Sequence, residues 1–304
     1  MNALEPTPLG VSLGLARMEW VGGSAANTNF VYRFGSSAGA GVDTSSLIPV
    51  SIFTGHSDFG GRARWAATFG GYPNADGNGH GTHVSGTAAG SRRGVAKSAN
   101  LIAVKMLSDQ GSGSVSDIVS GLNFVSTSAR SSGRPTIATM SLGGSASTAL
   151  ENAVSSPVQL VSQGIHVKVA AGNDNANADN TSPARVGVAN TIGASTINDT
   201  RASFSNFGSV VDIFAPGQLQ APGLAATNRI SGTSMVKCRL LEEVSRFWPH
   251  QATSHVAGLI AYLITRGGNA SPAVTTSRLK GIGINSALSS IPSGTVNLPA
   301  RNDV

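Results

Sequence analysis

The chain has 304 residues, of which 40% are hydrophobic, 12% are charged and 38 are glycine, and its formal net charge is +6. This composition is typical of a compact globular protein with many tight turns, and it excludes a disordered or coiled-coil chain. The basic residues are scattered and not interleaved with aromatic side chains, and no apolar run reaches the roughly 18 residues that span a bilayer, so we expect neither a nucleic-acid partner nor a membrane partner.

The first twenty residues, MNALEPTPLGVSLGLARMEW, contain no charged segment followed by a long apolar core. They therefore predict no signal peptide at this end of the chain. Cys238 is the only cysteine, which excludes an intramolecular disulfide.

Further along the chain, short apolar runs alternate with segments of helical periodicity. Buried strands are predicted at residues 101–107, 136–141, 165–171 and 210–214. Helices are predicted at residues 115–126, 146–163 and 255–263. Strands that alternate with helices are typical of βαβ units around a parallel sheet. No repeat, low-complexity tract or linker divides the chain, so we expect a single α/β domain over residues 1–304.

One stretch, DGNGHGTHVSGTAAG from Asp76, surrounds His80 with small residues before an apolar helical pattern. Glycines on both sides let the backbone pack closely and leave an imidazole exposed at the start of a helix. A structural histidine is the alternative interpretation. The i, i+3 spacing of His80 and His83 would also permit metal binding, although no third ligand cluster stands nearby.

Two further stretches carry polar side chains in turns of small residues. Ser234 lies in Gly-Thr-Ser-Met, which is not the G-x-S-x-G elbow of α/β-hydrolases, and His80 precedes it, the reverse of the order in that fold. Asn173 follows a predicted strand in Ala-Ala-Gly-Asn. Its amide could donate to an oxyanion or act only as a turn residue.

The ordered set of segments NGHGTHVSGT, SLGG, VAAGN and SGTSM resembles the subtilisin-like serine proteases of peptidase family S8, and most of all their proteinase K-like branch in fungi. HSDFGGRA, GVAKSANLIAVKML, SFSNFGSVVDIFAPG and HVAGLIAYL extend the likeness over nearly the whole chain. The resemblance implies a three-layer α/β fold with a mostly parallel central sheet flanked by helices. It also implies a secreted, monomeric endopeptidase that needs no cofactor for catalysis.

By this resemblance, Ser234 is the nucleophile and His80 is the general base that takes its proton and returns it to the leaving amine. Asn173 and the backbone N–H of Ser234 would form the oxyanion hole.

The resemblance also assigns residues to substrate binding. The two walls of the primary specificity pocket would be Ser141, Leu142 and Gly143 on one side and Ala170, Ala171 and Gly172 on the other. Gly111, Ser112 and Gly113 would pair with the substrate backbone as an added strand. Because these walls are small and uncharged, we expect broad cleavage of protein or peptide substrates after apolar residues.

A structural calcium ion is a further expectation. Asp212 matches a calcium ligand of the family, and the carbonyls of Gly187 and Ala189 match its partners. A carboxylate with backbone oxygens suits a hard cation. Alternatively, Asp212 is a surface aspartate in a turn.

The catalytic aspartate departs from the family pattern, which has an Asp-Thr-Gly turn a few residues before the HSDF segment. The chain reads AGAGVDTSSLIPVSIFTGHSDFGG here. Asp43 could be the remnant of that turn, although it lies far from His56. We favour the other interpretation, in which Asp43 begins the strand and TSSLIPVS has replaced the part that carries the carboxylate. Asp58 would be structural.

Two segments interrupt the family pattern elsewhere. Residues 157–159, Pro-Val-Gln, break a predicted helix, because a proline inside a helix removes a backbone hydrogen bond at a cost of about 3 kcal/mol. Residues 236–251 separate the serine turn from the helix that follows it directly in the family. Residues 236–251 begin with valine, whose codons start with GT, and both segments end in glutamine, which can be encoded by CAG. Both segments could therefore be translated intron sequence. A genuine surface loop is the alternative, and sequencing the spliced transcript distinguishes the two.

Relatives are made with a secretion signal and an inhibitory pro-segment, whereas this chain begins close to the start of their mature domain. We expect this difference and the altered aspartate region to impair folding and activity. The competing hypotheses are a folded but inert relative that lacks a proper triad aspartate, and a metal hydrolase that uses His80 and His83.

Overall fold

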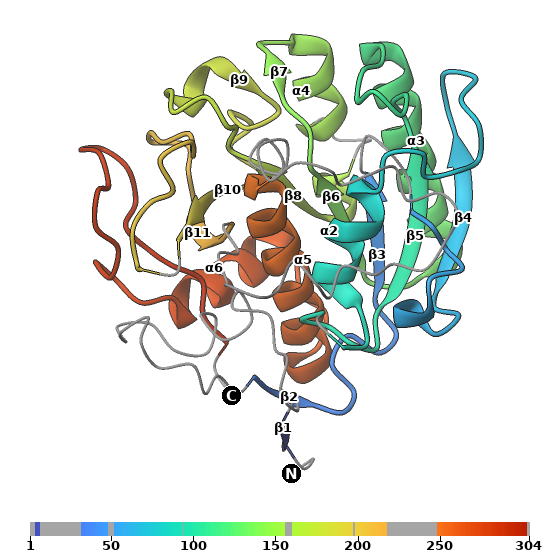
Figure 1. Ribbon diagram of the computed structural model, residues 1–304, viewed down its shortest axis with the longest axis horizontal. Coiled ribbons are helices and arrows are strands. Elements are labelled where there is room, and N and C mark those ends of the chain that lie inside the picture. Colours follow the sequence, from blue (N-terminus) through green and yellow to red (C-terminus); the bar gives the residue numbers. More distant parts are fainter. Residues whose placement is uncertain are drawn as a thin grey trace.

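The computed structural model describes residues 4–6, 32–47, 52–92, 94–155, 160–196, 198–217 and 248–302. Seven of the described strands form the central sheet: β3 (Asp43–Leu47), β4 (Ala63–Thr68), β5 (Asn100–Lys105), β6 (Thr136–Met140), β8 (His166–Ala170), β10 (Asn190–Ser195) and β11 (Ile213–Pro216). They are parallel and lie in the order β11-β10-β8-β6-β3-β5-β4 (Figure 1). Two antiparallel pairs lie outside this sheet, β1 (Leu4–Pro6) with β2 (Arg33–Gly35) and β7 (Gly144–Ser145) with β9 (Thr181–Ser182).

The described helices are α2 (His80–Ala89), α3 (Val115–Ser132), α4 (Thr148–Ser155), α5 (Trp248–Gly267) and α6 (Pro272–Ile282). Short 3-10 turns cover Ser57–Phe59, Val161–Gln163 and Ala178–Asn180. None of the described helices combines the length and the apolar character that crossing a bilayer requires.

The two faces of the sheet carry separate hydrophobic cores. On β5, Leu101 and Ala103 belong to the core shared with α2 and α5, while Ile102 and Val104 belong to the core shared with α3 and α4. This alternation follows from the two-residue period of a strand, whose successive side chains point to opposite faces. The three-layer α/β arrangement expected from the sequence is therefore confirmed.

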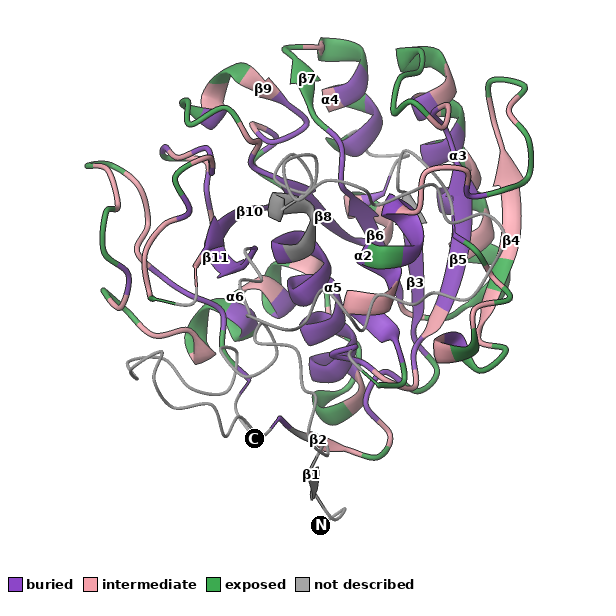
Figure 2. Ribbon diagram, viewed as in Figure 1, coloured by how far each residue is buried: buried purple, intermediate pink, exposed green. Residues whose placement is uncertain are grey.

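Helix α5 is the central helix of one face. Its residues from Ala252 to Ile264 are buried on every side, as Figure 2 shows. The helix also packs closely against α2: a Cβ on Gly258 would lie 2.6 Å from the carbonyl oxygen of Ala88. Near its carboxyl end, Thr265 accepts a 3.0 Å hydrogen bond from the N–H of Gly39, just before β3 begins. The amino end of α5 therefore points to the carboxyl edge of the sheet.

Most predicted elements are present with shifted ends. The predicted helix 146–163 is wrong as a single helix, because α4 ends at Ser155 and a separate 3-10 turn begins at Val161. The break surrounds residues 156–159, which lie outside the described residues and include the proline expected to interrupt it. The predicted strand 210–214 begins only at Ile213. The periodicity did not reveal β4, β10 or α6.

Strand β3 has an unusual composition for its position. It lies between β6 and β5, near the middle of the sheet, where parallel strands are normally continuous apolar runs. Thr44 is 2% exposed, pairs in register with Leu101 and Ile137, and its hydroxyl has no hydrogen-bond partner. The interpretation that TSSLIPVS has replaced the carboxylate-bearing part of the family's strand stays a prediction, and β3 is the strand in which that sequence begins.

Replacing Thr44 with valine is expected to stabilise the protein by about 1 kcal/mol, because the change removes a buried hydroxyl that makes no hydrogen bond. Thr136 is the matched control, since its equally buried hydroxyl donates to the Arg134 carbonyl at 3.0 Å. Thr136→Val should destabilise by about 1 kcal/mol. Urea unfolding of both variants measures the difference, and equal effects of the same sign would refute this account of β3.

Two buried basic side chains, His166 and Lys168, point from β8 toward the layer of α5, because the alternate residues Val167 and Val169 belong to the opposite core. Burial lowers the pKa of Lys168 to about 7, against the opposing effect of the Asp212 carboxylate. Burial also lowers the pKa of His166 to about 4, assisted by the charge of Lys168 and opposed by a hydrogen bond with Asn269.

The free energy of unfolding should therefore rise with pH above neutrality. Between about pH 7 and about pH 10.4 the unfolded chain holds the Lys168 proton and the folded chain has lost it, so the unfolded state binds more protons. The contribution is at most about 1.4 kcal/mol per pH unit. Lys168→Met should flatten this rise in urea unfolding curves recorded across the window. An unchanged slope in the variant would contradict the assignment.

Candidate active site

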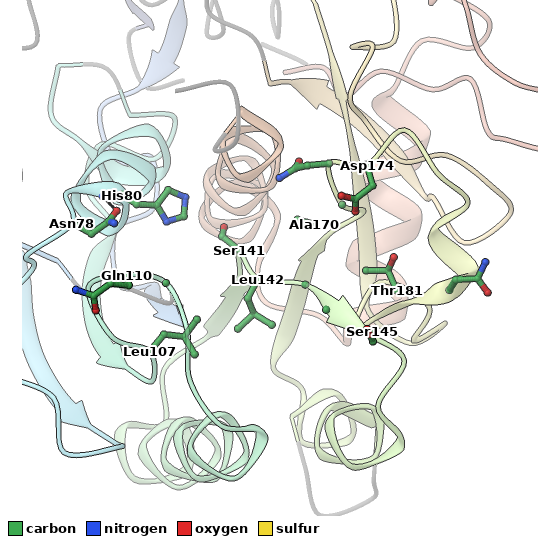
Figure 3. A pocket seen from close by; sticks show the side chains of 16 residues that line it. Asn78, His80, Leu107, Gln110, Ser141, Leu142, Ser145, Ala170, Asp174 and Thr181 are labelled. Carbon is green, nitrogen blue, oxygen red and sulfur yellow. Dashed lines mark hydrogen bonds between the residues drawn. The ribbon is translucent and has the colours of Figure 1, made fainter. Parts of the chain in front are cut away.

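A cleft of about 540 Å³ opens at the carboxyl edge of the central sheet. Figure 3 shows His80, Gln110 and Leu107 on one side, Asp174 and Thr181 on the other, and Ser141 and Leu142 between them. The two sides belong to different parts of the chain. One is formed by α2 and the turn after β5, and the other by the segments that follow β6 and β8.

His80 is the first residue of α2 and is 5% exposed. The helix start is held by Asp76, whose Oδ1 accepts from the backbone N–H of Gly79 at 2.7 Å and whose Oδ2 accepts from that of Thr82 at 3.1 Å. Burial raises the pKa of the Asp76 carboxyl, and these hydrogen bonds oppose the rise. Gly79 has a φ of 86°, a left-handed conformation that glycine adopts without strain. The imidazole is thus positioned at the positive end of a helix dipole.

Asn173 lies in the turn that leaves β8, and this turn is organised by the buried Asn206. The Asn206 side chain donates to the carbonyl of Ala171 at 3.0 Å and accepts from the N–H of Asp174 at 2.9 Å. Gly172 has a φ of 114°, and a Cβ there would lie 2.2 Å from the Asn206 amide nitrogen. The backbone on both sides of Asn173 is therefore held rigidly by one buried side chain.

The cleft brings together many of the predicted substrate-binding residues. Those that line it are Gly111, Ser141, Leu142, Gly143, Ala170 and Gly172, together with the predicted catalytic residues His80 and Asn173. Ala171 is fully buried behind the wall. Ser112 and Gly113 continue the turn beyond the lining residues, and Gly113 packs against Leu107. Ser234 lies outside the described residues, as do residues 157–159 and 236–247.

Asp43 does not partner His80 in this structure. It is the first residue of β3 and therefore lies at the amino edge of the sheet, opposite the cleft. Its Oδ1 accepts from the Asn100 amide at 2.8 Å and from the Arg134 guanidinium at 3.4 Å. The interpretation of Asp43 as the remnant of the catalytic turn is therefore wrong, and the alternative, that Asp43 begins the strand, agrees with the bounds of β3.

The expected calcium ligands lie far from the cleft, at the amino edge. Asp212 precedes β11, and Gly187 and Ala189 precede β10. Asp212 Oδ1 lies 2.6 Å from Nζ of Lys280, and its Oδ2 accepts from the N–H of Thr191 at 2.8 Å. Within the described ranges, no three His, Cys, Asp or Glu side chains converge as metal ligands would, at His80 and His83 or elsewhere.

Sequence reasoning did not identify the residues that hold the catalytic candidates in place. Asp76 and Asn206 are in the quoted stretches DGNGHGTH and SFSNFG, but nothing local in those stretches shows that they cap a helix or brace a distant turn. Asn78 and Asp174 also line the cleft and were not predicted. The tendency of buried Asp and Asn to accept several backbone N–H groups is the one signal that could have indicated them.

Comparison with known proteins agrees with this geometry. The sequence model of the Subtilase family matches residues 56–302. Subtilisin-like protease 2 of Pseudogymnoascus destructans is 46% identical over 99% of this chain and 70% of its own length. The cuticle-degrading protease of Metarhizium anisopliae is 44% identical over 89% of this chain and 66% of its own length.

Among solved structures, a cold-adapted subtilisin-like serine proteinase superimposes with a TM-score of 0.78 and 33% sequence identity, covering 95% of this chain and 97% of that protein. The family match, the curated relatives and the shared fold agree with one another. The chain therefore belongs to the subtilase family of serine endopeptidases.

Proposed function

We propose that this chain cleaves peptide bonds by acyl transfer to Ser234, with His80 as general base and then general acid. The observation that carries the proposal is that His80, at the amino end of α2, and Asn173, on the turn after β8, line one cleft. Helix α5 follows the Ser234 segment in the chain, and its amino end points to the same edge of the sheet. The proposal therefore places the nucleophile, the base and the oxyanion donor at that edge.

In the proposed reaction, Ser234 Oγ forms a bond to the scissile carbonyl carbon while His80 takes the hydroxyl proton. The amide of Asn173 and the backbone N–H of Ser234 would stabilise the negative oxygen. In a subtilisin, loss of the side-chain donor costs about 10²–10³ in turnover. His80 then protonates the leaving amine, and a water molecule releases the acyl group by the reverse sequence.

The lining of the cleft supports a broad, apolar-leaning preference for the residue before the scissile bond. Ser141, Leu142 and Gly143 face Ala170 and Gly172, and the described residues of these two walls carry no charge. Gly111, Ser112 and Gly113 are proposed to pair with the substrate backbone, because Gly111 lies in the lining and its neighbours are exposed.

By family resemblance the protein is proposed to be secreted and monomeric, with protein or peptide substrates. No cofactor takes part in the proposed reaction. Calcium at Asp212 is not proposed, because the Lys280 ammonium contacts the carboxylate that was expected to bind it.

A serine-directed phosphonate with an apolar side chain tests the proposal. We expect it to label Ser234 in the folded full-length chain, as mass spectrometry of the labelled peptide would show, and to block hydrolysis of a peptide with the same apolar residue. Ser234→Ala should abolish the labelling. A chain that is folded by circular dichroism yet unlabelled would refute the proposal and leave an inert member of the family.

A further inference from the structure

Asp212 is hydrogen-bonded to strand β10 through both its backbone and its side chain. Its N–H donates to the Thr191 carbonyl at 2.9 Å, and its Oδ2 accepts from the Thr191 N–H at 2.8 Å. The carboxylate is therefore held in one orientation at the point where β11 begins. Oδ1 is left facing away from Thr191 and is the oxygen that a cation would contact.

Lys280 supplies that cation from helix α6. Its Nζ lies 2.6 Å from Asp212 Oδ1, and the side chains of Lys280 and Asp212 are 41% and 23% exposed. One turn earlier on the same face of α6, Thr276 accepts a 2.9 Å hydrogen bond from the side-chain amide of Asn190. Two successive turns of α6 are thus attached to the β10–β11 edge, which restrains the lysine near its partner.

A second amine lies behind this pair. Lys168 is buried on β8, opposite Asn190 in the sheet register, and its Nζ donates to the Asn190 side-chain oxygen. The Asp212 carboxylate is close enough to raise the pKa of Lys168 against the effect of burial. Lys280 is thus the amine that contacts Asp212, whereas the Lys168 amine contacts Asn190.

Calcium binds oxygen ligands at about 2.3–2.6 Å, so an ion bound to Asp212 Oδ1 would occupy the position that the Lys280 ammonium holds. The ion would have to displace that ammonium from the carboxylate oxygen. The calcium ion and the displaced ammonium would repel each other, which opposes binding of the ion. The carbonyls of Gly187 and Ala189 cannot offset this, because they carry no net charge. The residues present do not fit calcium.

We infer that the Lys280 ammonium takes the place of a structural calcium ion and that the Asp212–Lys280 pair joins α6 to the β10–β11 edge without metal. This part of the fold should then keep its stability in the presence of chelators. The inference concerns stability and does not depend on the proposed peptidase activity.

Thermal unfolding with chelator and with excess calcium tests the inference on four forms of the full chain: unmodified, Asp212→Asn, Lys280→Met and Lys280→Met combined with Asp212→Asn. Methionine keeps the apolar stem of the lysine and removes its charge. Any calcium response from elsewhere in the chain is common to all forms. We expect the unmodified chain and Asp212→Asn to show the same calcium response, and Lys280→Met alone to show an additional rise in melting temperature.

Two outcomes would overturn the inference. One is a calcium response of the unmodified chain that Asp212→Asn reduces, because Asp212 would then bind the ion despite Lys280. The other is a Lys280→Met variant with no additional response, because the lysine would then not be what excludes calcium. Should Lys280→Met fail to fold, equilibrium dialysis with calcium compares the unmodified chain with Asp212→Asn, and one fewer bound ion in the variant overturns the inference.

Discussion

Deletion of residues 236–251 is expected to raise kcat/KM toward an apolar peptide substrate by about 100-fold. In the family pattern, the serine turn that ends in Met235 runs directly into the helical sequence that begins at Ala252. Ala252 is buried within α5. A nucleophile at the amino end of a helix gains from its exposed N–H groups and its dipole, and a displacement of about 1 Å from the reactive geometry can cost about 100-fold in rate.

A chain in which residues 236–251 are replaced by a Gly/Ser linker of equal length is the matched control, because it keeps the spacing and removes only the composition. We expect no gain from it. A folded deletion variant that is no faster than the full chain would show that this segment does not limit the reaction. In that case, a spliced transcript that encodes the segment would support a genuine surface loop.

Replacement of His80 with alanine should lower kcat/KM by at least about 10³-fold, because in a subtilisin the loss of the catalytic histidine costs about 10⁶ in turnover. His83, one turn along the same helix, is exposed and absent from the cleft lining. His83→Ala should therefore stay within about twofold of the unmodified chain. Both histidine variants are best compared in whichever is faster, the full chain or the chain that lacks residues 236–251. Peptide hydrolysis and the rate of phosphonate labelling measure the effect.

The same pair of variants separates the serine mechanism from a metal mechanism. Equal losses in His80→Ala and His83→Ala, together with inhibition by chelator and indifference to the phosphonate, would indicate a metal hydrolase. Loss in His80→Ala alone, with sensitivity to the phosphonate, is the result that the cleft geometry favours.

Much of the fold could be read from the order of residues, because its signals are local. The apolar run that includes Leu101–Val104 predicted a buried strand, which is present as β5. The helical spacing after Val115 predicted a helix over residues 115–126, and α3 continues beyond it to Ser132. The ends of the strands were harder to predict. Strand β5 ends at Lys105, which is fully buried although charged residues rarely are, because it pairs with Asp109 beyond the strand.

The candidate site could be predicted only in part. The sequence indicated His80 and Asn173 because small residues surround each of them. Asn206 did not stand out, because its importance lies in four backbone and side-chain hydrogen bonds to residues more than 25 positions away. The residues next to Asn206 in the sequence do not indicate such distant hydrogen bonds.

What the sequence determined by itself is the family, and the ordered motifs around His80, Asn173 and Ser234 predict the reacting groups. Only the tertiary structure decided which charges face which. It placed Asp43 at the edge of the sheet opposite the cleft and brought Lys280 to Asp212 across 68 positions. The physical reason is that an ion pair forms wherever folding brings opposite charges together, and that proximity is set by the packing of α6 on the sheet and not by the residues next to either charge.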